Sequence, residues 1–302
     1  MPSHKAAGSD GIAARILKIA APAISLPLSR LINHCIDTGT FRSAWKTAKV
    51  TPLYKGQGSK DDKNNYRPIS VLPLLSKIFE KHVHQALYSY MRNNNLLYTL
   101  QSGFRRSYST ETALIRVMDQ LLSDMDKDQV SGLVFLDYKK AFDLIDLDIL
   151  QSKLEADGII SKELTLLANY LKGRRTSVVI GGVQSEYRLI THGVPQGSVL
   201  GPLLFIIFVN DLPNSVSQST VDIYADDTTL STSAVVGLDL PAIQQRLQDD
   251  INNIADWTSN NRMALNASKI KSLLVTGERL EKKAPDTNLK LSCNGSEIEQ
   301  IT

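Results

Sequence analysis

The spacing of apolar residues changes several times along the chain, and these changes predict a mixed α+β fold. Apolar residues recur at helical spacing in residues 1–48, 76–91, 112–126, 149–172 and 243–257. Shorter runs rich in β-branched and aromatic residues predict strands at 50–54, 66–71, 132–136, 176–180 and 187–190, and on both sides of residues 225–227. The pattern is that of helices packed on sheets.

Three of the expected helices carry a defined apolar stripe, which predicts the side that is buried. In residues 76–91 the inward positions are Ile78, Phe79, Val83, Leu87 and Tyr90. In residues 112–126 the core-facing stripe is Leu114, Met118, Leu121 and Met125. In residues 243–257 it is Ile243, Leu247, Ile251, Ile254 and Trp257.

Acidic residues stand at two of the predicted strand ends. Asp137 closes the apolar strand 132–136, and Asp226 and Asp227 occupy the tight turn between two short strands. Adjacent carboxylates repel each other, and a hard divalent cation relieves that repulsion. Taken alone, an Asp-Asp pair is also typical of a solvated surface turn. With Asp137 on the same sheet, three carboxylates could hold two Mg²⁺ or Mn²⁺ ions for phosphoryl transfer.

Two further segments suit contact with phosphates or nucleic acid. A polar, Gly-rich turn at residues 55–65 joins two predicted strands, and Lys55 and Arg67 at its bases could clamp a phosphate. A flexible surface loop is the alternative for this turn. Residues 101–110 combine paired arginines with aromatic and hydroxyl side chains, a mixture that favours backbone contact and base stacking.

Composition narrows the class of protein. Hydrophobic residues make up 42% of the chain and charged residues 22%, as in soluble globular proteins. The longest apolar run, 199–209, is too short to span a bilayer, so we expect no transmembrane segment. Only Cys35 and Cys293 occur, and they match no metal-ligand spacing. We therefore expect an intracellular protein, in the nucleus or cytoplasm, that is not secreted.

Charge is distributed unevenly between the two parts of the chain. Residues 1–110 carry 16 Lys or Arg and 5 Asp or Glu, whereas residues 111–302 carry 18 and 26. The net charge is therefore positive in the first third and negative in the rest. Such asymmetry suits a protein that grips a polyanion with one part and holds cations with another.

The chain resembles the reverse transcriptase domain of non-long-terminal-repeat (LINE-type) retrotransposons. Six sequence blocks carry this resemblance, and they occur in the order that the family has. They are Asn65-Tyr66-Arg67-Pro68-Ile69-Ser70, Gln101-Ser102-Gly103-Phe104-Arg105, Phe135-Leu136-Asp137 through Ala141-Phe142-Asp143, Gly193-Val194-Pro195-Gln196-Gly197-Ser198, Tyr224-Ala225-Asp226-Asp227, and Leu265-Asn266 with Lys269.

The resemblance implies an RNA-directed DNA polymerase that extends a DNA primer on an RNA template with dNTPs. It implies that Asp137, Asp226 and Asp227 bind two catalytic Mg²⁺ ions, with the Tyr138 carbonyl as a further ligand. Lys269 is implied as the proton donor to the leaving pyrophosphate.

The resemblance also implies the residues that bind substrate. Lys55 and Arg67 would hold the triphosphate, and Gln196 with Gly197 would line the nucleotide and template pocket. Phe142 would lie under the sugar and reject a 2′-hydroxyl. The other implied contacts are Tyr224 for substrate and Arg105, Arg106, Arg174 and Arg175 for nucleic acid.

The fold implied is a right-hand polymerase in which an antiparallel palm sheet is backed by helices. We expect fingers at residues 1–127 and a palm at residues 128–302, with 150–190 partly in the fingers. We also expect the chain to end before the primer grip and the thumb. The sequence departs from the family pattern at Leu144–Leu147 and at Ile270, neither of which is an expected metal ligand.

Two other interpretations stay open at this point. One is a catalytically silent retroelement remnant that at most binds nucleic acid. The other is a reverse transcriptase of the group II intron type, although the Tyr66-Arg67-Pro68-Ile69-Ser70 block favours the LINE type. The sequence contains no indication of oligomeric state or of membrane association.

Overall fold

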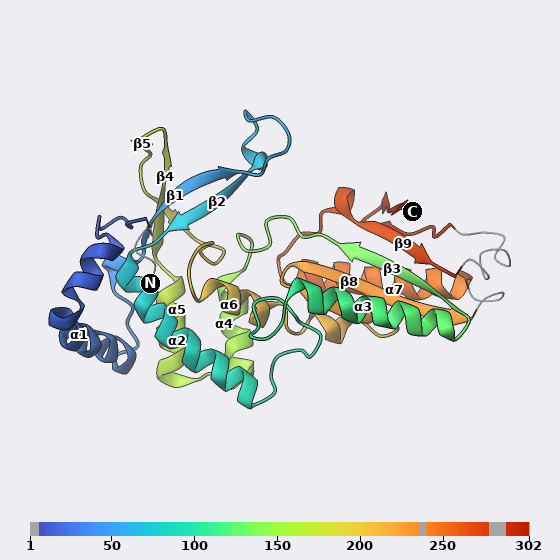
Figure 1. Ribbon diagram of the computed structural model, residues 1–302, viewed down its shortest axis with the longest axis horizontal. Helices are drawn as coiled ribbons and strands as arrows, with labels where there is room; N and C mark the ends of the chain where they lie inside the picture. Colours follow the sequence, from blue (N-terminus) through green and yellow to red (C-terminus); the bar gives the residue numbers. More distant parts are fainter. Residues whose placement is uncertain (1–5, 236–239, 278–287, 302) are drawn as a thin grey trace. The chain divides into compact units, whose positions relative to one another are not determined.

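The computed structural model describes residues 6–235, 240–277 and 288–301, and these form two compact units. The first unit comprises residues 1–96 and 145–207, and the second comprises residues 97–144 and 208–302 (Figure 1). The mixed α+β content with sheets backed by helices is as expected. The division at residue 96 lies well before residue 127, where we expected the fingers to end, and all of 145–207 groups with the N-terminal residues.

The first unit is built on a sheet that contains the expected basic hairpin. Its strand order is β2-β1-β4-β5, and β6 also pairs with β4. β1 and β2 are antiparallel, whereas β1 and β4 are parallel. The strands are β1 (Thr47–Tyr54), β2 (Tyr66–Val71), β4 (Arg174–Ile180), β5 (Val183–Gln184) and β6 (Arg188–Ile190).

Five helices belong to the first unit, with α6 reaching one residue beyond it. They are α1 (Ala14–Asp37), α2 (Leu74–Asn93), α4 (Leu147–Ala156), α5 (Ser161–Leu171) and α6 (Gly201–Phe208). An aromatic cluster joins α2 and α5, because the Phe41 ring lies 5.2 Å from Phe79 and 5.0 Å from Tyr170, both edge-on. The helical structure predicted for residues 149–172 is confirmed, as the helices α4 and α5.

The apolar stripe expected on α2 is only partly buried. Phe79 and Leu87 are in the core, whereas Tyr90 is 38% exposed and was wrongly assigned to it. The reason is its hydroxyl, which donates a hydrogen bond to the Asp157 carbonyl at 3.0 Å. A tyrosine can cover apolar surface while its polar end stays near water.

Helix α1 passes a test of length and hydropathy for a membrane-crossing helix. It has 24 residues, lies near the N-terminus and shows little burial, with Ile16, Ile19 and Leu26 each more than half exposed. Core helices and signal sequences pass the same test, so the finding is weak evidence for a membrane span. The absence of a transmembrane segment therefore stays a prediction.

The second unit holds a five-stranded sheet in the order β12-β9-β3-β8-β7. All neighbouring pairs are antiparallel except β12 and β9. The strands are β3 (Gln129–Leu136), β7 (Thr220–Tyr224), β8 (Asp227–Val235), β9 (Lys271–Val275) and β12 (Glu299–Ile301). A separate pair is formed by β10 (Ser292–Cys293) and β11 (Ser296–Glu297).

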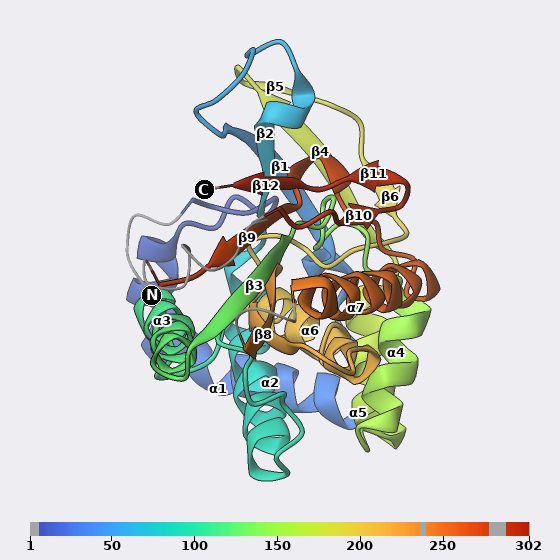
Figure 2. The same cartoon turned by 90° about the vertical axis from the view of Figure 1, so that its right-hand side faces the viewer.

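Helices α7 (Leu240–Asn260) and α3 (Thr110–Asp126) cover opposite faces of this sheet (Figure 2). On one face, a Cβ added to Gly132 would lie 2.6 Å from Ile243 and 2.9 Å from Leu247 of α7. On the other, Ser131 donates a hydrogen bond to Asp124 of α3 at 2.8 Å. Successive residues of β3 point to opposite faces, which separates the two helices.

The burial predicted for α7 is confirmed, whereas that for α3 is correct at Leu121 and wrong at Leu114 and Met118. The predicted α7 stripe from Ile243 to Trp257 is buried. In α3, Leu121 is buried, but Leu114 is 63% exposed and Met118 is 48% exposed. The helix instead turns Arg116 and Asp124 toward the sheet, because that face carries polar partners for them.

A buried carboxylate fixes the start of α6. Glu80 of α2 is fully buried, accepts a hydrogen bond from the Ser76 hydroxyl at 2.6 Å, and accepts another from the Val199 amide at 2.6 Å. The Leu200 amide lies 3.4 Å from the same carboxylate oxygen. Val199 and Leu200 directly precede α6, and the first amide of the helix, Gly201, donates to the Ser198 hydroxyl at 2.9 Å. Glu80 thereby supplements, from another helix, the local cap at the start of α6.

We predict that Glu80→Met lowers the free energy of unfolding by about 1–3 kcal/mol, because buried donors lose their acceptor. Glu80→Gln should lose less, since the amide oxygen can still accept from Val199. Urea denaturation measures both. Glu155→Met on the exposed side of α4 is the control, expected within about 0.5 kcal/mol of the unmodified protein. Equal midpoints for Glu80→Met and the control would contradict the assignment.

Candidate active site

The expected acidic turn is a two-residue hairpin loop. Tyr224 of β7 pairs with Asp227 of β8, so that Ala225 and Asp226 form the turn and Asp227 begins the second strand. Ala225 has φ +60°, a left-handed conformation that disfavours an L-residue by about 1–2 kcal/mol. Turns with this geometry at the first central position usually have glycine there. The hairpin therefore carries strain at the residue beside Asp226.

Asp137 lies on the same face of the second-unit sheet as Asp227. The last registered pair of β3 and β8 is Leu136 with Thr228, and one further step places Asp137 opposite Asp227. Side chains opposite each other in an antiparallel pair have Cβ atoms about 4.5–5.5 Å apart. The turn of the β7–β8 hairpin and the C-terminal end of β3 thus bring together carboxylates from distant parts of the sequence.

The pKa values of the two carboxylates at the hairpin are both perturbed. The pKa of Asp226 is raised above its usual value, first by burial and also by the negative charge of Asp137. The pKa of Asp227 is raised by burial, then by the charges of Asp226 and Asp137. Both shifts mean that the ionised forms are disfavoured when no cation is near.

Asp137 is held in place from the segment after α7. The Asn266 side-chain amide donates to the Asp137 carboxylate at 2.8 Å, and the Asn266 backbone amide donates to the Asp137 carbonyl, also at 2.8 Å. The Lys269 ammonium lies 3.8 Å from the same carboxylate, with its side chain 65% exposed. The predicted proton donor and one predicted metal ligand are therefore neighbours. Asn266 belonged to a recognised block, but the sequence alone gave it no role.

The two aromatic residues after Asp137 differ in accessibility. The Tyr138 side chain is 7% exposed and burial raises the pKa of its phenol, so only its backbone can meet a substrate. Phe142 is half-buried, and its ring lies edge-on to Phe104 at a centroid distance of 6.0 Å. Tyr224 is half-buried on β7 beside the acidic turn.

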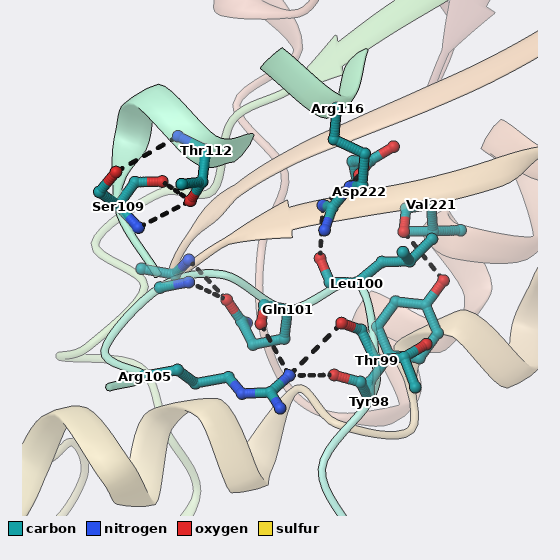
Figure 3. Close-up of polar contacts among 12 residues, drawn as sticks. Tyr98, Thr99, Leu100, Gln101, Arg105, Ser109, Thr112, Arg116, Val221 and Asp222 are labelled. Atoms are coloured by element: carbon teal, nitrogen blue, oxygen red, sulfur yellow. Dashed lines mark hydrogen bonds and ion pairs between the residues drawn. The ribbon is translucent and has the colours of Figure 1, made fainter. Parts of the chain in front are cut away.

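The loop that was expected to touch nucleic acid is packed along β7 (Figure 3). Arg105 donates to the carbonyls of Tyr98 at 2.8 Å and Gln101 at 3.0 Å, and its guanidinium lies 4.5 Å from the Tyr108 ring. Arg105 thus holds the loop together. Arg106 is exposed, which is compatible with the contact predicted for it.

In the first unit, strand register gathers basic side chains on one face. Arg67 is opposite Leu53, and Arg175 is beside Thr47 in the parallel pair. Alternate residues of β1 share a face, so Lys49 lies on the same side as both arginines, and Lys55 follows directly after the end of β1. Lys55 also donates to the Asn64 carbonyl at 2.7 Å. The sequence analysis did not select Lys49. The alternation of side chains along the predicted strand could have placed it on this basic face.

The Gly-rich loop before α6 is fixed against β2. The Ser70 amide donates to the Gln196 carbonyl at 2.8 Å. Gly197 has φ +104°, and a Cβ there would lie 2.6 Å from the Ser70 carbonyl oxygen. No larger residue fits without movement of β2. Gln196 and Gly197 are thereby brought to the strand that carries Arg67.

Arg174, for which a nucleic-acid contact was predicted, is buried inside the first unit. The residue is 3% exposed, donates to the Tyr170 carbonyl at 2.9 Å and lies 4.7 Å from the Tyr170 ring. The neighbouring Arg175 is exposed. Alternation along β4 explains the difference, because one arginine faces the core and the next faces away.

The donor set suits a divalent cation, although it is not a closed metal cage. Within residues 6–235, 240–277 and 288–301, no group of three or more His, Cys, Asp or Glu side chains is arranged closely enough to hold a metal ion. Oxygen donors are nevertheless those that Mg²⁺ prefers, and it is commonly bound by one or two carboxylates with waters and substrate phosphates. The carboxylates whose pKa values are raised fit such an ion because its charge would relieve their repulsion.

Comparison of the sequence with known proteins identifies its family. Residues 58–291 match the family model of the reverse transcriptase (RNA-dependent DNA polymerase). The chain is 31% identical to the RNA-directed DNA polymerase from mobile element jockey of Drosophila melanogaster, over 89% of this chain and 30% of that protein. It is 29% identical to the probable RNA-directed DNA polymerase from transposon X-element of the same species, over 92% of this chain and 30% of that protein.

A third relative from Drosophila melanogaster, the probable RNA-directed DNA polymerase from transposon BS, is 30% identical over 89% of this chain. The chain spans about 30% of the length of these relatives. The family model covers most of the chain and includes Asp137, Asp226 and Asp227. The chain therefore belongs to the reverse transcriptase (RNA-dependent DNA polymerase) family, among the polymerases of non-LTR retrotransposons.

Proposed function

We propose that the chain carries out RNA-templated DNA synthesis, adding deoxynucleotides from dNTPs to the 3′-hydroxyl of a primer. The observation that carries the proposal is the placement of Asp137 opposite Asp227, with Asp226 at the adjoining turn. Carboxylates whose pKa is raised by burial and by a neighbouring carboxylate, as for Asp226 and Asp227, are typical of functional sites. The polymerase names of the relatives support an RNA template and a DNA product made from dNTPs, and a DNA primer is proposed with them.

The aspartates have the central role in the proposed mechanism. Asp137, Asp226 and Asp227, with the Tyr138 carbonyl, would hold divalent cations, Mg²⁺ or Mn²⁺. Such ions, when bound, stabilise the attacking and leaving oxygens of phosphoryl transfer. Asn266 orients the Asp137 carboxylate through its 2.8 Å hydrogen bond. The Lys269 ammonium would then donate a proton to the leaving pyrophosphate.

The basic face of the first-unit sheet is proposed as the substrate grip. Lys55 and Arg67 would bind the triphosphate, since Lys55 directly follows β1 and Arg67 lies near the start of the paired strand β2. Gln196 and Gly197, fixed to the end of β2, would line the nucleotide and template pocket. Arg175 shares that face and would contact the nucleic acid backbone. We propose that this unit corresponds to the fingers.

The second unit would correspond to the palm. There, Phe142 would lie under the sugar of the incoming nucleotide, Tyr224 would contact substrate, and Arg106 would contact nucleic acid. An intracellular location, in the nucleus or cytoplasm, is proposed with this activity, because its template and substrates are found there.

A primer-extension assay on an RNA template with Mg²⁺ tests the proposal. We expect extension by the unmodified chain and a loss of about 10³-fold or more in Asp226→Asn, because metal ions supply several kcal/mol of transition-state stabilisation. Asp119→Asn on the exposed side of α3 is the matched control and should retain activity. Equal extension by Asp226→Asn and the unmodified chain would refute the metal assignment. Binding of an RNA–DNA hybrid without extension would instead indicate a silent remnant.

We predict that Asp226→Asn stabilises the metal-free protein at neutral pH. The pKa of Asp226 is raised in the folded state, so its contribution to stability is present at low pH and lost as pH rises through the folded pKa. Replacing the carboxylate removes that loss. The gain in Tm should therefore be largest near pH 7 and vanish below the usual Asp pKa of 3.8. Thermal unfolding in EDTA measures it. A gain that is the same at every pH would contradict the assignment.

We predict that Phe142→Val increases incorporation of ribonucleotides relative to deoxynucleotides, because a smaller side chain leaves room for the 2′-hydroxyl. Single-nucleotide extension with matched dNTP and rNTP gives the ratio of kcat/KM values. Phe104→Val, in the ring that packs edge-on against Phe142, controls for loss of the aromatic contact. If Phe142→Val leaves the ratio unchanged, Phe142 does not select the sugar.

A further inference from the structure

The segment before the Gly103 loop forms an extra, parallel edge beside the catalytic hairpin. The Ile223 amide of β7 donates to the Leu100 carbonyl at 3.1 Å, and the Ser102 amide donates to the Ile223 carbonyl at 2.7 Å. Gln101 and Ile223 form the corresponding parallel bridge. β7 is the last strand of its sheet, so this segment satisfies backbone groups that an edge strand leaves open.

The side chain of Gln101 reaches past β7 to the turn itself. It is 2% exposed, and its amide oxygen accepts hydrogen bonds from the Ala225 amide at 3.0 Å and the Gly103 amide at 2.7 Å. Both partners are donors, which fixes the orientation of the side-chain amide. Ala225 is the turn residue with φ +60°, directly before Asp226. A strained conformation persists only where its surroundings stabilise it. Gln101 stabilises this one by accepting the hydrogen bond from Ala225.

Gly103 allows this contact to form. A Cβ added to Gly103 would lie 2.2 Å from the Ala225 nitrogen and 2.7 Å from its Cα. These atoms are backbone, so a side chain at 103 could be accommodated only by moving the turn. The close approach of two backbones therefore requires glycine.

The other end of the segment is anchored as firmly (Figure 3). The Tyr98 hydroxyl donates to the Val221 carbonyl at 2.9 Å. Arg116 of α3 donates to the Leu100 carbonyl at 3.1 Å and to the Asp222 carboxylate at 2.7 Å. Residues 98–103 are thus tied to β7 along their whole length, and Gln101 transmits that rigidity to the turn.

We propose that Gln101 is a positioning residue for the catalytic turn: through Ala225 it sets the place of the Asp226 carboxylate, and Gly103 provides the clearance. Gln101 acts on Ala225 and does not touch substrate. The inference deepens the proposed function and rests on it for its kinetic consequence, whereas its structural consequence can be measured without activity.

The test compares Gln101→Met with the unmodified chain in two measurements. Hydrogen exchange, followed by mass spectrometry on the metal-free protein, should show faster exchange in peptides covering 221–229 and unchanged exchange in β3. Primer extension should show kcat lowered by about 10²-fold with KM for dNTP within a few-fold, because small displacements of catalytic groups have effects of that size. Gln101→Glu keeps an oxygen acceptor, so its peptides covering 221–229 should exchange as slowly as those of the unmodified chain.

Gln248→Met is the matched control, because the Gln248 amide oxygen also accepts a backbone hydrogen bond, from Ser292 at 2.9 Å, away from the turn. This control should change neither the hydrogen exchange of residues 221–229 nor the kcat of primer extension. If Gln101→Met does not fold, Gln101→Asn, one methylene shorter, serves in its place. Exchange or kcat equal to the unmodified chain in the Gln101 variant overturns the inference. An unmodified chain that does not extend a primer refutes the proposed function, while the exchange measurement still decides the role of Gln101.

Discussion

The carboxylates at one end of the second-unit sheet repel one another, and the residues around them must hold them in place against that repulsion. Burial and the charge of Asp137 raise the pKa of Asp226 and of Asp227, and Asp226 raises that of Asp227 further, so the ionised arrangement is unfavourable for the isolated chain. It persists because neighbours outside the acidic group hold Asp137 and the turn that carries Asp226. Asn266 binds Asp137, and Gln101 holds the turn before Asp226. A divalent cation would turn the same repulsion into attraction, and this is how a strained arrangement becomes useful for phosphoryl transfer.

The two units support their functional residues by the same physical means. In each, a strand or loop that carries chemistry is fixed by hydrogen bonds from an element remote in sequence. Glu80 binds the amides that precede α6 and so fixes the loop that contains Gln196, while Ser70 binds that loop from β2. In the second unit the segment 98–103 has this role for β7. Buried polar groups of this kind are costly unless they are satisfied, and once satisfied they define one geometry.

Local patterns predicted the elements well, because they depend on spacing that the sequence displays directly. The strand ending at Asp137, the hairpin at Ala225 and the buried stripe of α7 are examples. Errors arose where a partner distant in sequence decides which side is buried. In α3, Arg116 faces the sheet because it donates a hydrogen bond to Asp222 on β7. Arg174 is buried because it packs on the Tyr170 ring and donates to the Tyr170 carbonyl. Gln101 lay in a recognised block, yet nothing local indicated that its partner is Ala225.

The central claim is that the three aspartates form a cation site, and direct binding of Mn²⁺ tests it most simply. Electron paramagnetic resonance of free Mn²⁺, titrated with the protein, measures the bound fraction without any need for template or turnover. The unmodified chain should bind Mn²⁺ in competition with Mg²⁺, and the double variant Asp137→Asn with Asp226→Asn should bind much less. Equal binding by the two proteins would contradict the account.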